Sequence, residues 1–214
     1  DAQVIGIIVG DQLRDQVDEI DHRRPIAIVL DKTPFYGEMG GQVGDTGQLI
    51  GQDFRFEVTD SHVEGGFTLH VGHLREGSVA LADALTARVD ADRRQGIRRA
   101  HSATHVLHWA LQKYLGEHAQ QQGSKVDRDV LRFDFTNSGA VDRQMLDRIE
   151  NEINALAIEA VAIESVEMPL AEAKQLGATM LFGEKYPDVV RVVSVGDFSK
   201  ELCGGTHLDN SGLI

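Results

Sequence analysis

The sequence predicts an α+β protein in which a β-rich first part precedes a part that mixes helices and strands. Two observations support this class. Up to about residue 90, short runs of β-branched and aromatic residues alternate with turns rich in glycine or charge. Beyond that point, apolar residues recur at intervals of three and four, as they do along one face of a helix. We therefore expect two domains, residues 1–90 and residues 91–214.

The first domain is expected to be a small barrel of short strands. Runs with strand composition cover residues 4–9, 26–31, 54–60, 67–74 and 84–90. Their regular spacing is typical of small all-β folds. Residues 35–47, FYGEMGGQVGDTG, contain five glycines, so we expect a loop with unusual backbone angles between two of these strands.

The second domain is expected to place helices on one side of an antiparallel or mixed sheet. The predicted helices cover residues 92–115, 142–161 and 170–176. The predicted strands cover residues 129–135, 163–169 and 189–196. Asp92 is the expected cap of the first helix, with Gln95 completing a capping box, and Gly116 is expected to end it.

Composition limits the partners and the compartment. The formal net charge of −13 argues against a protein that coats nucleic acid without specificity, and we expect no DNA partner. No apolar run is long enough to span a bilayer, so we expect no membrane partner. A single cysteine excludes an internal disulfide and indicates a reducing compartment, the cytoplasm. The chain does not begin with Met, which favours a piece of a longer protein.

Four residues have the identities and spacing of metal ligands. HSATH places His101 and His105 four apart on one helix, so both imidazoles face the same side. CGGTH adds Cys203 and His207 from the end of the chain. Each pair alone is weak evidence, because helical histidine pairs and buried cysteines are common. Together, three histidines and one cysteine match the ligands that zinc prefers.

The neighbouring residues exclude one alternative and add a charge argument. A zinc protease needs glutamate directly after the first histidine, and Ser102 stands there instead. His108 is expected to be a neighbour of the site, not a ligand. A Zn²⁺ ion with one thiolate and three neutral imidazoles keeps a formal charge of +1, which attracts a phosphate or an ester carbonyl.

A basic cluster precedes the first histidine. Its members, Arg93, Arg94, Arg98 and Arg99, fall within seven residues. A solvated helix face explains such a cluster as well as a binding patch does. Arg94 and Arg98 lie within two helical turns before His101, however, so they are candidate RNA contacts that lead toward the metal.

Five motifs together resemble the editing region of alanyl-tRNA synthetases and of their free-standing relatives. In chain order they are FYGEMGGQVGDTG, HSATHVLHWAL, GSKVDRDVLRFDF, LFGEKYPD and LCGGTH. The resemblance covers essentially the whole chain. It implies a translation-factor-like barrel followed by a two-layer α/β editing core. It also implies hydrolysis of the ester that joins serine or glycine to the tRNA for alanine.

The resemblance also assigns residues and partners. It carries the metal ligands over to the four residues named above, and it places Gln42 and Thr33 in the substrate pocket. Lys125 and Lys185 are candidate contacts to tRNA phosphate, although exposed solvated lysines are an equally good explanation. The implied partners are the acceptor end of the tRNA for alanine and the rest of the synthetase in cis.

Two other functions stay open. One is a zinc-stabilised tRNA-binding module that has no turnover of its own. The other is an editing domain of the threonyl-tRNA synthetase type, which shares the histidine and cysteine motifs. Because four protein ligands complete a tetrahedral shell, we expect zinc mainly to organise the pocket.

Overall fold

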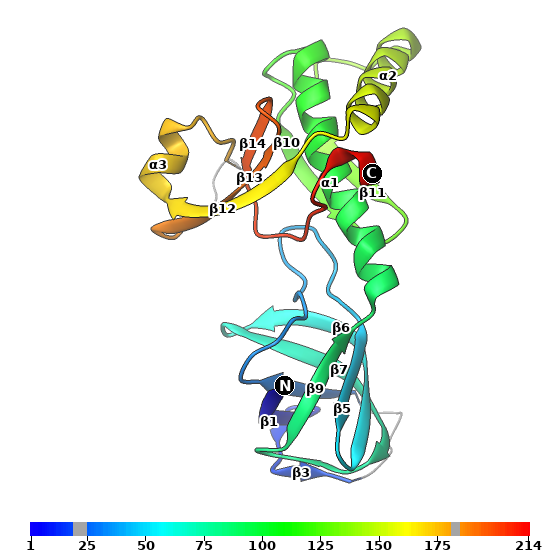
Figure 1. The fold of residues 1–214 in the computed structure, drawn as a ribbon, viewed down its shortest axis with the longest axis vertical. Helices are drawn as coiled ribbons and strands as arrows, with labels where there is room; N and C mark the ends of the chain where they lie inside the picture. Colours follow the sequence, from blue (N-terminus) through cyan, green and yellow to red (C-terminus); the bar gives the residue numbers. More distant parts are fainter. Residues whose placement is uncertain (19–24, 181–184) are drawn as a thin grey trace. The chain divides into compact units, whose positions relative to one another are not determined.

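The computed structural model describes residues 1–18, 25–180 and 185–214, which form two compact units, Asp1–Arg94 and Gln95–Ile214. Strand residues outnumber helical residues, so the chain has the mixed α and β content that the sequence predicts, with strands predominant (Figure 1). The domain boundary predicted between residues 90 and 91 stays a prediction.

The first unit is built on an antiparallel sheet of order β2-β1-β4-β7-β6-β5-β9, with a further pairing between β1 and β9. These pairings alone do not show a closed barrel, so the barrel stays a prediction. The strands are β1 (Ala2–Val9), β2 (Gln12–Leu13), β4 (Ile26–Leu30), β5 (Gly47–Gly51), β6 (Phe54–Glu64), β7 (Phe67–Gly77) and β9 (Ala84–Val89). A separate short pair joins β3 (Gln16–Val17) and β8 (Val79–Ala80).

Alternation along these strands builds the core of the first unit. On β6, Phe54, Phe56 and Val58 are buried, whereas Arg55 between them is exposed. This period of two is the pattern of a strand with one buried face. All five strands predicted for this unit are present, and β5 was not predicted because it begins at the last glycine of the glycine-rich segment.

Helix α1 (Ala91–Leu115) carries the first two candidate ligands. The expected cap was wrong: Asp90, not Asp92, caps the helix, because its Oδ1 accepts a hydrogen bond from the backbone N–H of Arg93 at 3.0 Å. The helix ends as predicted, and Gly116 follows it with a φ of 112°.

The remaining elements are α2 (Arg143–Glu159), α3 (Leu170–Gln175) and the 3₁₀ turn η1 (Ser211–Leu213). The strands are β10 (Gln121–Val126), β11 (Leu131–Phe135), β12 (Ile163–Pro169), β13 (Val189–Val195) and β14 (Ser199–Leu202). β10 pairs with β11, and β12-β13-β14 forms a three-stranded antiparallel sheet. β10 and β14 were not predicted.

One buried cluster joins both helices to the three-stranded sheet. Val106 of α1 and Leu156 of α2 belong to the same apolar cluster as Val193 and Val195 of β13. β14 pairs with β13, so this packing fixes the strand that leads into the cysteine segment relative to α1. None of the described helices combines the length and the apolar content needed to cross a membrane.

Candidate metal centre

The structure brings the four predicted ligands together. One ligand atom from each of His101, His105, Cys203 and His207 lies within 4.8 Å of those of the others. The Sγ atom of Cys203 is 3.4 Å from Nε2 of His101 and 3.3 Å from Nε2 of His207. The rings of His101 and His105 stack with a centroid distance of 5.4 Å, as expected one helical turn apart. This cluster could bind a metal ion.

The loop that carries Cys203 is held by an arginine that sequence reasoning missed. The backbone N–H of Cys203 donates to the carbonyl of Arg191 on β13 at 3.0 Å. In return, Nη1 of Arg191 donates to the carbonyls of Cys203 at 3.1 Å and Gly205 at 2.5 Å. Its Nη2 donates to Oγ of Ser165 on β12. Protein hydrogen bonds therefore shape this loop.

A buried carboxylate lies behind the cluster. Nδ1 of His108 makes a hydrogen bond with Oε1 of Glu201 at 3.0 Å. Nδ1 of His105 lies 2.7 Å from Oε2 of the same carboxylate. This contact is an ion pair whose angles are not those of a hydrogen bond. Within the described residues, the buried Nε2 of His105 has no hydrogen-bond partner at all. An unpartnered buried nitrogen in a cluster of this kind fits a metal ligand.

Ser102, which stands where a zinc protease would have glutamate, has a structural role. Its Oγ accepts a hydrogen bond from the backbone N–H of Leu208 at 3.0 Å and lies 3.3 Å from Nδ1 of His207. Because Nδ1 of His207 faces this hydroxyl, Nε2 is the nitrogen that faces Cys203. His108 is not among the four clustered ligands, in line with the expectation.

The ionisation of Cys203 and of His207 favours the forms that bind cations. Burial would raise the pKa of the Cys203 thiol, but the three histidines that surround it more than offset this and hold it well below its usual range. Burial, aided by charge repulsion from the neighbouring histidines, lowers the pKa of His207 to about 4. A thiolate and a neutral imidazole are the forms in which these residues bind metals.

The carboxylate of Glu201 and the histidines beside it shift each other's pKa. Burial opposes the charged form of His105, but Glu201 and Cys203 together overcome it and raise the pKa of His105 to about 10, so a metal ion that binds this imidazole has to displace a proton. Burial would raise the pKa of Glu201, yet His105 and His108 hold it well below its usual range. Glu201 is therefore an anion, and it changes the predicted charge. A dication, one thiolate and one carboxylate sum to zero, so the formal charge of +1 counted from the ligands alone is not the charge of the whole buried cluster.

The two predicted RNA-binding arginines have protein partners. In the first unit, Nε of Arg94 donates to Oδ1 of Asp45 at 2.8 Å, and its Nη2 donates to the carbonyl of Pro34 at 2.8 Å. In the second unit, Arg98 donates to the carbonyl of His207 and lies 3.2 Å from Asp209. These contacts give both side chains a structural role, and contact with RNA stays a prediction.

The two predicted lysines are exposed. Lys125 lies on β10, directly opposite Arg132 on β11. Lys185 directly follows residues 181–184, the part of the LFGEKYPD motif that lies outside the described residues. Neither lysine forms an ion pair with any residue that the structure describes.

Thr33 and Gln42 belong to the first unit. The hydroxyl of Thr33 lies 2.7 Å from Nε2 of His70 and accepts a hydrogen bond from the backbone N–H of Phe35. Gln42 is fully buried, and its backbone pairs with that of Met39 across Gly40 and Gly41. These two glycines have φ values of 61° and 86°, the left-handed angles that a tight two-residue hairpin turn requires.

Comparison with known proteins decides the family. The model of the family "tRNA synthetases class II (A)" matches residues 1–93. The model of the family "Threonyl and Alanyl tRNA synthetase second additional domain" matches residues 190–214. The alanine–tRNA ligase of Rhodopirellula baltica is 47% identical over 221 residues, which cover the whole chain and 23% of that protein. The chain belongs to the alanine–tRNA ligase family.

Other alanine–tRNA ligases agree. That of Francisella tularensis subsp. mediasiatica is 49% identical over 214 residues, covering the whole chain and 24% of the relative. That of Legionella pneumophila strain Corby is 46% identical over the same length. The chain thus spans about a quarter of the alanine–tRNA ligases that it matches. The second of the two family models covers Glu201, Cys203 and His207.

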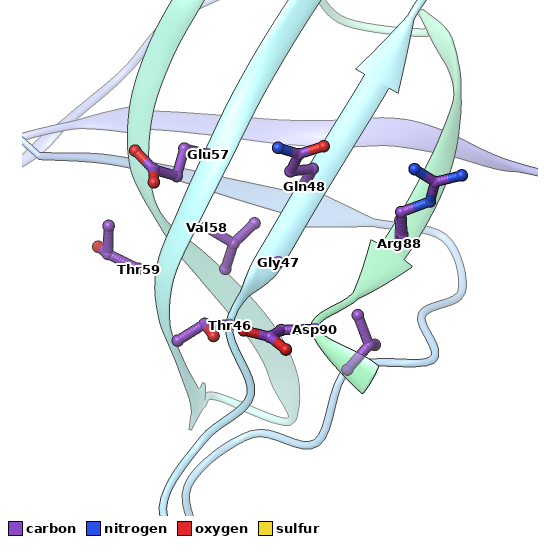
Figure 2. A pocket seen from close by; sticks show the side chains of 9 residues that line it. Thr46, Gly47, Gln48, Glu57, Val58, Thr59, Arg88 and Asp90 are labelled. Carbon is purple, nitrogen blue, oxygen red and sulfur yellow. The ribbon is translucent and has the colours of Figure 1, made fainter. Parts of the chain in front are cut away.

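A polar cavity of about 510 Å³ lies elsewhere, on the first unit (Figure 2). Gln48 of β5 is the cross-strand neighbour of Glu57 on β6 and of Arg88 on β9, and the three side chains line the cavity. None of the predicted site residues lines it. Sequence reasoning gave no signal for this cavity, because its residues come from three separate strands with ordinary surface composition.

Proposed function

We propose that the chain is the editing part of an alanine–tRNA ligase and hydrolyses the ester that joins serine or glycine to the tRNA for alanine. The observation that carries this proposal is the cluster of three histidines and one cysteine in a chain of this family. The family model that covers its C-terminal ligands is the second additional domain shared by threonyl and alanyl enzymes, which supports an editing-type domain.

We propose zinc as the metal of this site. His101, His105, Cys203 and His207 would hold it, and the borderline-soft donor set of imidazoles and one thiolate suits it. When bound, zinc can polarise a carbonyl or a water molecule. Since four protein ligands complete a tetrahedral shell, the proposed role is to organise the pocket around the tRNA end.

An editing site can remove serine, which a pocket for alanine cannot reject well by size alone. A pocket for alanine rejects the extra hydroxyl of serine only by roughly 10²-fold. A site whose buried polar groups need a hydroxyl partner can discriminate by roughly 10⁴-fold. Gln42 and Thr33 are the proposed readers of the substrate. Two of the hydrogen bonds of the Thr33 hydroxyl are used within the protein, so it has one lone pair left to accept from a serine hydroxyl.

The remaining parts of the proposal concern partners and surroundings. The acceptor end of the tRNA for alanine is the proposed RNA partner. Lys125 and Lys185 are the better candidates for phosphate contacts, because Arg94 and Arg98 already bind acceptors of the protein. The rest of the synthetase is the proposed partner in cis, the cytoplasm is the proposed location, and a closed barrel is the proposed form of the first unit.

A deacylation assay tests the proposal. The chain is mixed with Ser-tRNA, Gly-tRNA and Ala-tRNA for alanine, and with Ser-tRNA for threonine. We expect hydrolysis of the first two only, and a loss of at least about tenfold in the rate with Gln42→Ala, since removing a polar partner of the hydroxyl costs more than 1.4 kcal/mol. Binding of the tRNA without hydrolysis would instead support the tRNA-binding module. Selective hydrolysis of Ser-tRNA for threonine would support the threonyl-type alternative.

A further inference from the structure

We infer that Glu201 is a positioning residue of the metal centre: it holds His105 in the tautomer whose Nε2 binds the metal, and His108 in turn anchors Glu201. The inference rests on the proposed metal site, and it does not depend on the proposed hydrolysis. Neither the family matches nor the ligand motifs assign a role to Glu201 or to His108.

The backbone places these residues opposite one another. Glu201 is on β14, two residues before Cys203, so both side chains project from the same side of an extended segment. His105 and His108 are three apart on α1 and therefore share one face of the helix. The segment and the helix each present one ligand and one supporting residue, and the two supporting residues meet at 3.0 Å.

The carboxylate is buried, and its two oxygens are divided between the two histidines. Glu201 is only 9% exposed, and a buried carboxylate is stable only when it is paired. Oε1 binds Nδ1 of His108, and Oε2 lies 2.7 Å from Nδ1 of His105. A nitrogen beside a carboxylate carries the proton, so the other nitrogen of a neutral imidazole keeps its lone pair. For His105, that nitrogen is the buried and unpartnered Nε2.

Glu201 is not itself one of the clustered ligands. Carboxylate oxygens can bind metals, yet among the described residues the group of ligand atoms within 4.8 Å of one another consists of those of the three histidines and Cys203. Carboxylates behind metal-binding histidines commonly orient the ring and raise its basicity. The same carboxylate also balances the charge of the buried cluster, as counted above.

The test compares two charge-neutralising variants. Glu201→Gln removes the carboxylate that faces His105, whereas Glu164→Gln removes an exposed carboxylate on β12 whose cross-strand neighbour is Ser194. We measure Zn²⁺ affinity by competition with a chelator and record the absorption spectrum of the Co²⁺ form. Glu201→Gln is expected to weaken binding by about 10–100-fold, the usual effect of losing such a partner, and to change the Co²⁺ spectrum. Glu164→Gln should leave both the affinity and the spectrum as in the wild type. Equal affinity and equal spectra for all three chains would overturn the inference.

The wild-type chain gives a second test that does not depend on a variant folding. In the Zn²⁺-loaded chain, nitrogen-15 NMR of the histidine side chains should show a proton on Nδ1 of His105 and none on Nε2. The opposite tautomer would refute the inference while leaving the metal site intact. A wild-type chain that binds neither Zn²⁺ nor Co²⁺ would refute the metal site itself, and the inference with it.

Discussion

Two buried histidines, one in each unit, differ in how their ring nitrogens are satisfied. Both nitrogens of His70 in the first unit have partners: Nδ1 donates to the carbonyl of Ile28 at 2.8 Å, and Nε2 accepts from the hydroxyl of Thr33. His105 in the second unit has a carboxylate beside Nδ1 and no hydrogen-bond partner for Nε2 among the described residues. A fully satisfied imidazole serves the fold, whereas an unsatisfied one beside a thiol is suited to bind an ion.

The surrounding charge separates the two residues further. No described ion pair involves His70, and burial lowers its pKa. His105 is also buried, but Glu201 and Cys203 beside it outweigh its burial and raise its pKa to about 10. The difference shows that burial alone does not decide the protonation of a histidine, because neighbouring anionic groups can reverse its effect.

The largest expected effect is the loss of the metal from Cys203→Ala. This substitution removes the only thiolate of the cluster, so Zn²⁺ affinity should fall by well over 100-fold, more than the roughly 10–100-fold expected for an outer partner. Chelator competition measures the affinity. His70→Leu serves as the control and should bind Zn²⁺ as the wild type does. An equal loss of Zn²⁺ affinity in Cys203→Ala and His70→Leu would contradict the distinction drawn between His70 and His105.

A smaller effect is expected on stability from His70→Leu. The substitution leaves the carbonyl of Ile28 and the hydroxyl of Thr33 without their buried partner, which should cost about 2–4 kcal/mol. Hydrogen exchange of the β4 and β7 amides under native conditions reports the stability of this unit alone. A change below about 0.5 kcal/mol would mean that His70 is not the structural residue that its contacts indicate.

The smallest expected effect is a dependence on pH. Because burial lowers the pKa of folded His70 below its ordinary value of 6.5, the unfolded chain takes up a proton that the folded chain does not. Its contribution to stability is therefore complete above pH 6.5 and decreases as the pH falls below that value, by at most about 1.4 kcal/mol per pH unit. Hydrogen exchange gives the free energy of unfolding of each variant. The difference in this free energy between the wild type and His70→Leu should become smaller from pH 7.5 to pH 5.5. A difference that does not change with pH would contradict the lowered pKa.

The sequence predicted the elements with strong local patterns. The long helix that carries His101 and His105 follows from its apolar spacing, and the strand Ile163–Pro169 matches the predicted range. The clustering of the four candidate ligands was also predictable, because identity and spacing alone indicate four zinc-type donors; that they bind a metal stays a prediction. The structure places their ligand atoms together within 4.8 Å.

Other features depend on partners that lie far away in the sequence. Strand β5 begins and ends in glycine and exists because β6 and β9 pair with it on both sides. Asp90 and Asp92 are equally good caps by residue type, and only the backbone decides between them. Glu201 and Arg191 have the appearance of ordinary strand charges in the sequence, and only the fold brings each against the candidate ligands or their loop.

The hydrogen bonds that Arg191 donates to the loop of Cys203 have a thermodynamic consequence. Its guanidinium fixes two carbonyls of the segment between Cys203 and His207, so the conformational entropy of that segment is given up when the chain folds. Zinc fingers, in contrast, order their ligands only as the ion arrives. In this chain the proposed binding of an ion would not have to supply the free energy for ordering this segment, so we expect the loop to keep its conformation when the ion leaves.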